Sequence, residues 1–351
     1  MKDIAKRFPE NPLLSPADIV SSQEGLQVAC LLNPGVFQFD GKIWMIVRVA
    51  ERPEQRGDAI SFPILTETGV KIINIPIDDS ELNAKDARVI KYKGVDYLTT
   101  LSHLRLVSSQ EGRKFIEPEG YSLLIGQGLL ESFGIEDCRV SYIDGVYYLT
   151  YTAVSPNGVG VGLRTTRDWK NFQSRGMIFP PHNKDCAIFE EKINGMFFAL
   201  HRPSSLEIGG NFIWIASSID GIHWGNHQCI LKTRESSWDS SRIGAGASPI
   251  KTEQGWLSIY HGANRDNQYC LGAFLMDLQD PSKVIARTLV PIMVPTEEYE
   301  LTGFYGNVVF TNGHIKSPDN DTLLVYYGAS DEFVCGAEFS IKEIISLLQY
   351  C

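Results

Sequence analysis

Residues 133–153 read Phe-Gly-Ile-Glu-Asp-Cys-Arg-Val-Ser-Tyr-Ile-Asp-Gly-Val-Tyr-Tyr-Leu-Thr-Tyr-Thr-Ala, and they carry the clearest signal of secondary structure in the chain. Asp144 and Gly145 separate two runs in which apolar and polar residues alternate. Because the tight turn of a β-hairpin favours positive φ at both central positions, the pair predicts two antiparallel strands. Asp137 and Arg139 stand at the start of the first strand. They form either a structural ion pair, in which the guanidinium lowers the pKa of the carboxyl group, or part of a functional cleft.

The same unit recurs along the chain: a short apolar run, a turn with Gly or Asp, and an aromatic-rich strand that ends in polar residues. Units begin near residues 35, 87, 135, 186, 247 and 307. A spacing near fifty residues, with about four short strands in each unit, favours the blades of a β-propeller over a β-sandwich. We therefore predict an all-β chain that forms a single propeller domain over residues 1–351.

The blade number depends on residues 87–100, which count either as a blade or as an insertion. We predict five blades, with six as the alternative. Helical periodicity is confined to residues 340–348, which predicts a short C-terminal helix.

Composition narrows the class of partner. The net charge of −10 disfavours nucleic acid and anionic membranes, since both bind basic surfaces. No run of 18 apolar residues predicts a membrane span, and the N-terminal residues lack the apolar core of a signal peptide. Seven cysteines without a CxxC pair predict neither a disulfide framework nor a zinc site. We expect a cytoplasmic protein, or a periplasmic one if a signal peptide has been removed.

Polar residues gather where the inner strands of the predicted blades begin or end. In a propeller these ends converge at the axis, and charged side chains there form either a cleft or salt bridges between blades. The expected ligand contacts are Arg48, Arg88, His103, Arg139, Lys184, Asp185, His201, Arg202, Asp239, Tyr260, His261 and Asp331.

Carboxylates, arginines and aromatic residues without metal-ligand spacing suit a carbohydrate ligand and predict no metal site. Inverting cleavage of a glycoside needs an acid and a base roughly 6.5–9.5 Å apart. Spacing alone does not choose among the candidate carboxylates, which are Glu136, Asp137, Asp185, Glu190, Glu207 and Asp239.

Several blocks resemble glycoside hydrolase family 130, the mannoside phosphorylases and β-mannosidases. Residues 134–140 and 148–153 are similar to its signature G-I-E-D-P-R-x…Y-x-T-Y-T-A, and residues 183–203 to its N-K-D-x-A-L-F-P-E-K-I-x-G…L-H-R-P. The resemblance implies a five-bladed propeller that acts on β-mannosides with inversion. It also implies that Asp137 is the general acid and protonates through a hydroxyl of the sugar.

The departures from that pattern concern phosphate. The resemblance implies phosphate ligands at Lys184, at His201 and at arginines after Y-T-A. No arginine stands near Pro156 or Gly160, and Arg164 and Arg167 lie beyond these positions. An anion is poorly held beside too few cations, because charge-assisted bonds must replace its water.

Two further carboxylates favour hydrolysis in the same way. Glu190 stands where phosphorylases carry proline, and Glu207 follows the His201-Arg202-Pro203 block. Either could repel phosphate and activate water as the base.

The sequence thus predicts a glycoside hydrolase, an inverting exo-acting β-mannosidase that cleaves β-1,2-linked mannosides. Asp137 is its acid, and Glu207 or Glu190 its base. One alternative is a β-mannoside phosphorylase that releases mannose 1-phosphate, and another is a non-catalytic carbohydrate-binding propeller. The expected partner is a mannose-containing oligosaccharide. We expect no cofactor, and inorganic phosphate as co-substrate only under the phosphorylase alternative.

Overall fold

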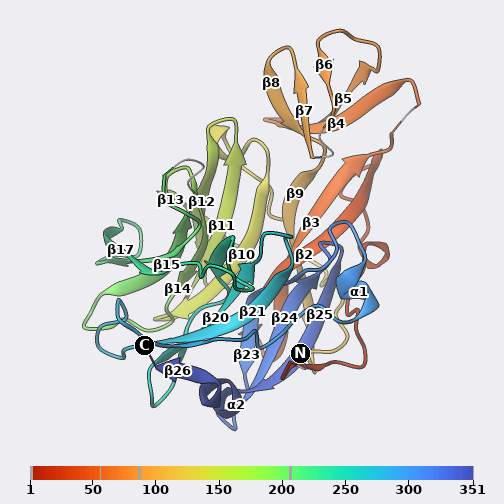
Figure 1. Ribbon diagram of the computed structural model, residues 1–351. Coiled ribbons are helices and arrows are strands. Elements are labelled where there is room, and N and C mark those ends of the chain that lie inside the picture. Colours follow the sequence, from red (N-terminus) through yellow and green to blue (C-terminus); the bar gives the residue numbers. More distant parts are fainter. Residues whose placement is uncertain (1–2, 56, 86–87, 205–207, 351) are drawn as a thin grey trace.

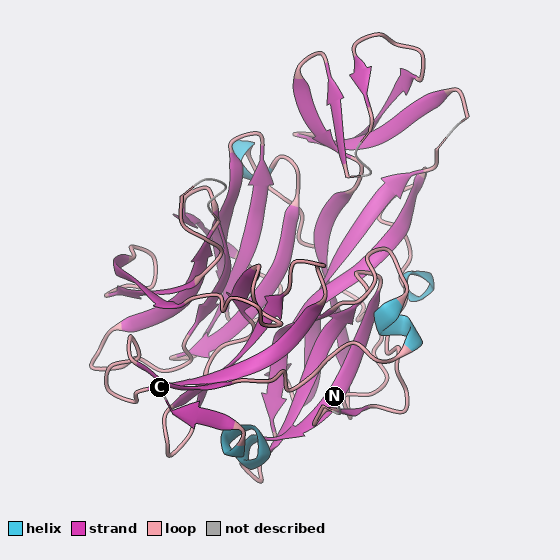
Figure 2. Cartoon of the chain, in the orientation of Figure 1, coloured by secondary structure: helices cyan, strands magenta, loops and turns pink. Residues whose placement is uncertain are grey.

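The computed structural model describes residues 3–55, 57–85, 88–204 and 208–350. Their regular secondary structure is almost entirely β-strand (Figures 1 and 2), as predicted. The helices are α1 (Glu298–Leu301), α2 (Ile341–Ser346) and 3₁₀ turns at Pro16–Asp18 and Leu129–Glu131. Helix α2 lies within the predicted segment 340–348, and the Ser340 side chain caps it by accepting a hydrogen bond from the Glu343 N–H. None of the described helices has the length and hydropathy that crossing a bilayer requires.

Five larger sheets carry most of the described strands, and none of the sheets closes on itself. The first three sheets take their strands in sequence order: β2 (Leu26–Phe39), β3 (Lys42–Pro53) and β9 (Leu101–Ser109); β10 (Ile135–Ile143), β11 (Val146–Ser155), β12 (Gly158–Thr166) and β13 (Gln173–Phe179); and β14 (Asn183–Ile188), β15 (Phe197–Pro203), β16 (Ile213–Ser218) and β17 (Gly225–Leu231).

The last two of the five include strands from the ends of the chain. The fourth comprises β18 (Arg242–Ala245), β19 (Ile250–Lys251), β20 (Trp256–Ala263), β21 (Tyr269–Met276), β22 (Val284–Thr288) and the C-terminal β26 (Leu348–Tyr350). The fifth comprises β23 (Val309–Lys316), β24 (Thr322–Ala329), β25 (Phe333–Ser340) and the N-terminal β1 (Lys6–Arg7), which pairs with β25.

Two small sheets are inserted between β3 and β9 and stand apart from the rest at the top of Figure 1. Their strands are β4 (Ala59–Thr66) and β5 (Gly69–Pro76), and β6 (Leu82–Asn83), β7 (Val89–Tyr92) and β8 (Val95–Leu98). They share a core of their own, built on Phe62, Ile75 and Ile90. We refer to residues 59–98 as the appendage.

The hairpin predicted from residues 133–153 is confirmed. Strands β10 and β11 pair antiparallel, with Ile143 opposite Val146. Asp144 and Gly145 both have positive φ, 50° and 77°, as this tight turn requires.

Each larger sheet packs against two others through a separate apolar core. One example is the core between the first and second sheets, where the Trp169 ring stacks 3.6 Å from the ring of Phe37. Similar cores join the second sheet to the third, the third to the fourth, the fourth to the fifth, and the fifth back to the first. The polar ends of the inner strands are thereby brought together.

Candidate active site

A polar pocket of about 190 Å³ lies where strands from all five larger sheets meet. It collects side chains that are up to about three hundred positions apart in sequence, together with one from the appendage. Its lining comprises Leu32, Asn33, Arg48, Arg88, Asp137, Lys184, Asp185, Arg202, Arg242, Tyr269, Tyr305, Val308, Phe310 and Asp331.

A local irregularity directs polar side chains into this pocket from three strands. The pairing register shifts around Asn33 in β2, Asp137 in β10 and Asp185 in β14, and the three residues have φ of 36°, 49° and 53°. Asn and Asp tolerate positive φ better than other residues with a Cβ, and β-bulges often re-aim a side chain beside a functional site.

Asp137 is buried and held by two side chains. Its Oδ1 accepts hydrogen bonds from Asn33 Nδ2 at 3.1 Å and from Arg48 Nη1 at 3.2 Å. Burial alone would raise the pKa of this carboxyl group, but the positive charges of Arg48, Arg139 and Lys184 outweigh burial and lower the pKa. Arg48 also binds Glu136, with Nη2 2.8 Å from Oε1.

Arg139 does not pair with the carboxylate of Asp137. Its guanidinium donates to three backbone oxygens, of Asp137, Ala245 and Gly246, and to Asp185 Oδ1 at 3.2 Å. It therefore ties β10 to β14 and to the end of β18, and it positions the backbone under Asp137.

Asp185 is the centre of a buried charge network. Besides Arg139, its carboxylate lies 3.1 Å from Arg202 Nη1 and 3.3 Å from His261 Nε2. Burial raises the pKa of Asp185, but Arg202, His261 and Arg139 together hold it well below its usual range. His261 is buried, stacks on Phe310 at 4.0 Å, and has its pKa lowered to about 4 by burial.

Two cations in the pocket form no salt bridge with a described carboxylate. Arg242 donates instead to neutral groups, to Tyr269 Oη at 3.1 Å and Asn267 Oδ1 at 2.7 Å, and its buried Nε has no partner among the described residues. Lys184 is the other, and its positive charge contributes to the lowered pKa of Asp137. Arg202 adds a third cation, whose charge is shared with Asp185. The pocket is therefore suited to bind an anion beside Asp137.

Asp331 differs from the other acidic residues of the pocket in its pKa. Burial raises the pKa of Asp331 to about 6, and the negative charges of Asp137 and Glu136 add to this increase, against the effect of Arg48. It can therefore change protonation near neutral pH.

We expect the stability of Asp331→Asn, relative to that of the wild type, to increase as the pH rises. In the wild type, the folded state keeps the Asp331 proton up to about pH 6, whereas the unfolded state releases it near 3.8, the ordinary pKa of an aspartate. The wild type therefore loses stability between these values, and the variant does not incur this loss. Melting temperatures at pH 4.5 and pH 7.5 check this, and a difference between the two proteins that does not change with pH would contradict it.

Arg139 and His261 lie behind the pocket lining, and four further predicted contacts lie outside it, namely His103, His201, Asp239 and Tyr260. His103 is buried, with Nε2 3.3 Å from Glu51 Oε2. His201 is buried beside Asn183 and His227. Neither of these histidines lines the pocket.

Asp239 and Tyr260 belong to a separate buried network. Asp239 Oδ2 lies 2.8 Å from Arg234 Nη2, 2.5 Å from Arg287 Nη2 and 2.8 Å from the Tyr260 hydroxyl. This network joins strands of the fourth sheet to the loop before it.

The two candidate bases have different positions. Glu190 follows the far end of β14 and lines another cavity, which shares none of its lining residues with the pocket around Asp137. Glu207 lies outside the described residues.

Sequence reasoning missed five polar or aromatic residues of the pocket: Asn33, Arg242, Tyr269, Tyr305 and Phe310. Asn33 and Arg242 carry a usable signal, because each is a polar residue near the start or at a break of an inner strand, like Asp137. The other three come from an outer strand, a loop and the edge of β23, and no comparable pattern marks them.

Comparison with known proteins identifies the family. A family model described as beta-1,4-mannooligosaccharide phosphorylase matches residues 47–350. The chain belongs to glycoside hydrolase family 130. The resemblance seen in the sequence is thus confirmed.

Relatives within family 130 are similar over 70% or more of this chain. The beta-1,2-mannobiose phosphorylase of Listeria innocua is 41% identical over 350 residues, covering 98% of each chain. The 1,2-beta-oligomannan phosphorylase of a Thermoanaerobacter species is 38% identical over 70% of this chain and 80% of its own. A solved structure of the Listeria enzyme in complex with beta-1,2-mannobiose matches with a TM-score of 0.92, again at 41% identity and over 98% of each chain.

These relatives overturn the prediction of hydrolysis. Each of them is named as a phosphorylase, so the hydrolase and β-mannosidase prediction is wrong, and the alternative of a phosphorylase is better supported. The physical error was to count arginines along one loop. Arg164 pairs with buried Glu131 and Arg167 contacts the backbone oxygen of Gly145, whereas the pocket takes its positive charge from other sheets. Family 130 remains a family of glycoside-processing enzymes, and its phosphorylases use inorganic phosphate as co-substrate.

Proposed function

We propose that this family 130 chain is a phosphorylase of β-1,2-linked mannooligosaccharides, with β-1,2-mannobiose as its simplest substrate. Phosphate oxygen attacks the anomeric carbon, the bond from that carbon to the glycosidic oxygen breaks, and the leaving oxygen takes a proton. Attack from the opposite face converts the β-mannoside into α-mannose 1-phosphate and free mannose. The observation that carries the proposal is the pairing of Asp137 with a pocket that holds cations free of salt bridges to described carboxylates.

We assign phosphate to the side of the pocket formed by Lys184, Arg202 and Arg242. These three bring positive charge from β14, β15 and β18, and two of them have no described carboxylate as salt-bridge partner. A phosphate dianion needs charge-assisted hydrogen bonds to replace its water, and this side supplies them.

The mannosyl group that is transferred occupies the side of Asn33, Arg48 and Asp331. Asn33 and Arg48 both donate to Asp137, and Asp331 lies close enough to Arg48 and Asp137 for their charges to shift its pKa. Donors and acceptors that alternate around one space suit sugar hydroxyls. Arg88 adds a contact from the appendage.

Asp137 supplies the proton to the leaving oxygen, through a sugar hydroxyl as the family resemblance implies. In the ligand-free pocket the surrounding cations lower its pKa, so the carboxyl group is ionised at neutral pH and holds no proton to donate. Bound phosphate adds negative charge beside those cations and so raises the pKa of Asp137 in the complex. Phosphate is then both the nucleophile and the group that prepares the acid.

The packing order of the sheets supports a five-bladed propeller as the architecture. Five sheets joined in a ring by five apolar cores match five blades around an axis, with the small sheets as an insertion in the first. On this assignment residues 1–351 form one catalytic domain.

The direct test is to incubate the protein with β-1,2-mannobiose with and without phosphate. We expect α-mannose 1-phosphate and mannose only when phosphate is present, with the α anomer visible by proton NMR from the first turnover. Release of two mannose molecules without phosphate would contradict the proposal and indicate a hydrolase. Binding of mannobiose without turnover in either buffer would instead indicate a carbohydrate-binding protein.

Arg242→Ala should raise the KM for phosphate by about tenfold or more, because the variant loses one charge-assisted hydrogen bond to phosphate. The KM for β-1,2-mannobiose should change much less, because we place this arginine on the phosphate side. Initial rates with each substrate varied in turn give both constants. Arg167→Ala is the matched control, since that guanidinium lies at the surface against Gly145. Equal increases in both KM values would contradict the assignment.

A further inference from the structure

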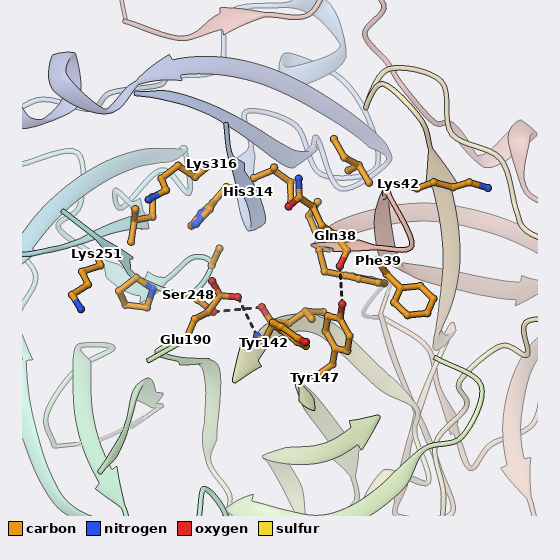
Figure 3. A pocket seen from close by; sticks show the side chains of 18 of the residues that line it. Gln38, Phe39, Lys42, Tyr142, Tyr147, Glu190, Ser248, Lys251, His314 and Lys316 are labelled. Carbon is orange, nitrogen blue, oxygen red and sulfur yellow. Dashed lines mark hydrogen bonds between the residues drawn. The ribbon is translucent and has the colours of Figure 1, made fainter. Parts of the chain in front are cut away.

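A second, larger cavity lies at the opposite end of the inner strands. Its volume is about 790 Å³, and Figure 3 shows Gln38, Glu190, Ser248 and His314 around a common space, whereas Lys42 and Lys251 extend away from it. Strand β10 runs from one cavity to the other: Asp137 lines the first, and Tyr142, five residues later, lines the second. At the usual rise of a strand the two residues are roughly 15 Å apart. The proposed reaction uses no residue of this cavity.

The cavity wall presents an aromatic surface that is held in place. The Tyr142 side chain is 50% exposed, and its ring lies 4.6 Å from that of Tyr147. Tyr147 is buried and donates from its hydroxyl to the backbone oxygen of Gln38 at 2.7 Å. The inner ring is therefore fixed, and the outer ring has an open face against which an apolar ligand face can stack.

Hydrogen-bonding groups with unused capacity line the same cavity. Glu190 Oε1 accepts from the Tyr142 N–H at 3.1 Å, while Oε2 accepts nothing from the described residues. Lys316 lines the same space and forms no salt bridge with a described carboxylate. His314 is neutral near pH 7, because burial lowers its pKa to about 4, and a neutral imidazole offers one donor and one acceptor.

The charge of the lining is balanced, which favours a neutral ligand. Lysines and carboxylates are equal in number, and the six are Asp40, Lys42, Glu190, Glu191, Lys251 and Lys316. One pair of them, Lys251 and Glu191, is already joined. Such a wall neither concentrates anions as the Asp137 pocket does nor offers the apolar surface that a lipid needs.

We propose that this cavity is a second carbohydrate-binding site, which holds a neutral oligosaccharide without cleaving it. A sugar ring stacks on Tyr142, and its hydroxyls bind Glu190, Lys316 and His314. The volume lies within the usual range of about 300–1,000 Å³ for small-molecule sites. The site goes beyond the proposed reaction, and only the choice of a β-1,2-mannooligosaccharide as the probe rests on the proposed function.

The experiment measures the number of binding sites. Isothermal titration calorimetry with β-1,2-mannotriose in phosphate-free buffer should give two sites per wild-type chain. Tyr142→Ala should weaken one of them by about tenfold, as expected for the loss of one stacking contact. Glu190→Gln should weaken the same site. Phosphorolysis of β-1,2-mannobiose by both variants should match the wild type.

A second exposed tyrosine provides the matched control. Tyr350 is 72% exposed on β26 and lines neither cavity, so Tyr350→Ala should keep both sites. A single site in the wild type, or two sites of unchanged affinity in Tyr142→Ala, would contradict the proposal. This failure is distinct from failure of the proposed function, which shows as absent phosphorolysis whatever the number of sites. If two sites are found, one of them weakened in Tyr142→Ala, but no phosphorolysis, the second binding site is supported and the proposed reaction is contradicted.

Discussion

Asp137→Asn is expected to lower kcat for phosphorolysis of β-1,2-mannobiose by about 10²- to 10⁴-fold, the usual contribution of a general acid. Asparagine keeps the shape of the side chain but has no proton to transfer to the leaving oxygen. It also removes the charge that Arg48 meets at 3.2 Å. Arg48 keeps its second partner, Glu136 at 2.8 Å, so no unpaired charge is buried and the variant should fold.

The nature of the leaving group separates acid catalysis from a merely structural role. A nitrophenolate departs without a proton, so the variant should lose much less activity with 4-nitrophenyl β-mannoside than with mannobiose. Rates on both substrates, with the melting temperature of each protein, make the comparison. Equal losses on the two substrates would assign Asp137 to positioning instead.

Asp144→Asn is the matched control for this variant. Asp144 lies on the same hairpin with almost the same φ, 50° against 49°, but it is exposed and pairs with Lys192. Its substitution tests whether an aspartate of this backbone conformation is needed for folding. We expect it to leave kcat unchanged.

The sequence predicted the local structure well because its signals are local. The Asp144-Gly145 turn and the alternation around it fix a hairpin without reference to the rest of the chain. The family resemblance also came from contiguous blocks. The bulges at Asn33 and Asp185 were not predicted, since their only sequence signal is a polar residue, in the middle of β2 and near the start of β14 respectively.

The sequence failed where the answer depended on which distant side chains share a space. Asp239 satisfied the same criteria as Asp185, yet it is enclosed by Arg234, Arg287 and Tyr260 outside the pocket. Arg242 was overlooked, although it lines the pocket and has no described carboxylate as salt-bridge partner. The charge balance of a pocket built from five sheets cannot be summed along one loop, and the predicted hydrolase rested on such a sum together with the two carboxylates Glu190 and Glu207.

Asp185→Asn should reduce the free energy of unfolding by about 3–5 kcal/mol at neutral pH, the usual cost of removing one partner from a buried ion pair. Asp185 is 2% exposed and is the only described carboxylate that pairs with Arg139 and Arg202, which are themselves buried. Without its charge, two guanidinium groups from β10 and β15 face each other across the base of the pocket. Urea denaturation of both proteins measures the difference. Activity should fall as well, since Arg139 holds the backbone under Asp137.

The pH dependence and an exposed pair make this prediction specific. The folded-state pKa of Asp185 lies well below 3.8, the ordinary value for an aspartate, so the contribution of its charge is complete above about pH 4 and is lost as the pH falls further. The difference between wild type and Asp185→Asn should therefore stay constant from pH 8 to about pH 5 and shrink in more acidic buffer. Lys192→Ala removes a cation from a solvent-exposed pair, that with Asp144, and should cost no more than about 1 kcal/mol. If Asp185→Asn cost as little as Lys192→Ala, the two arginines would have to be stabilised by their backbone hydrogen bonds alone, and Asp185 would be a ligand of the substrate rather than the centre of the network.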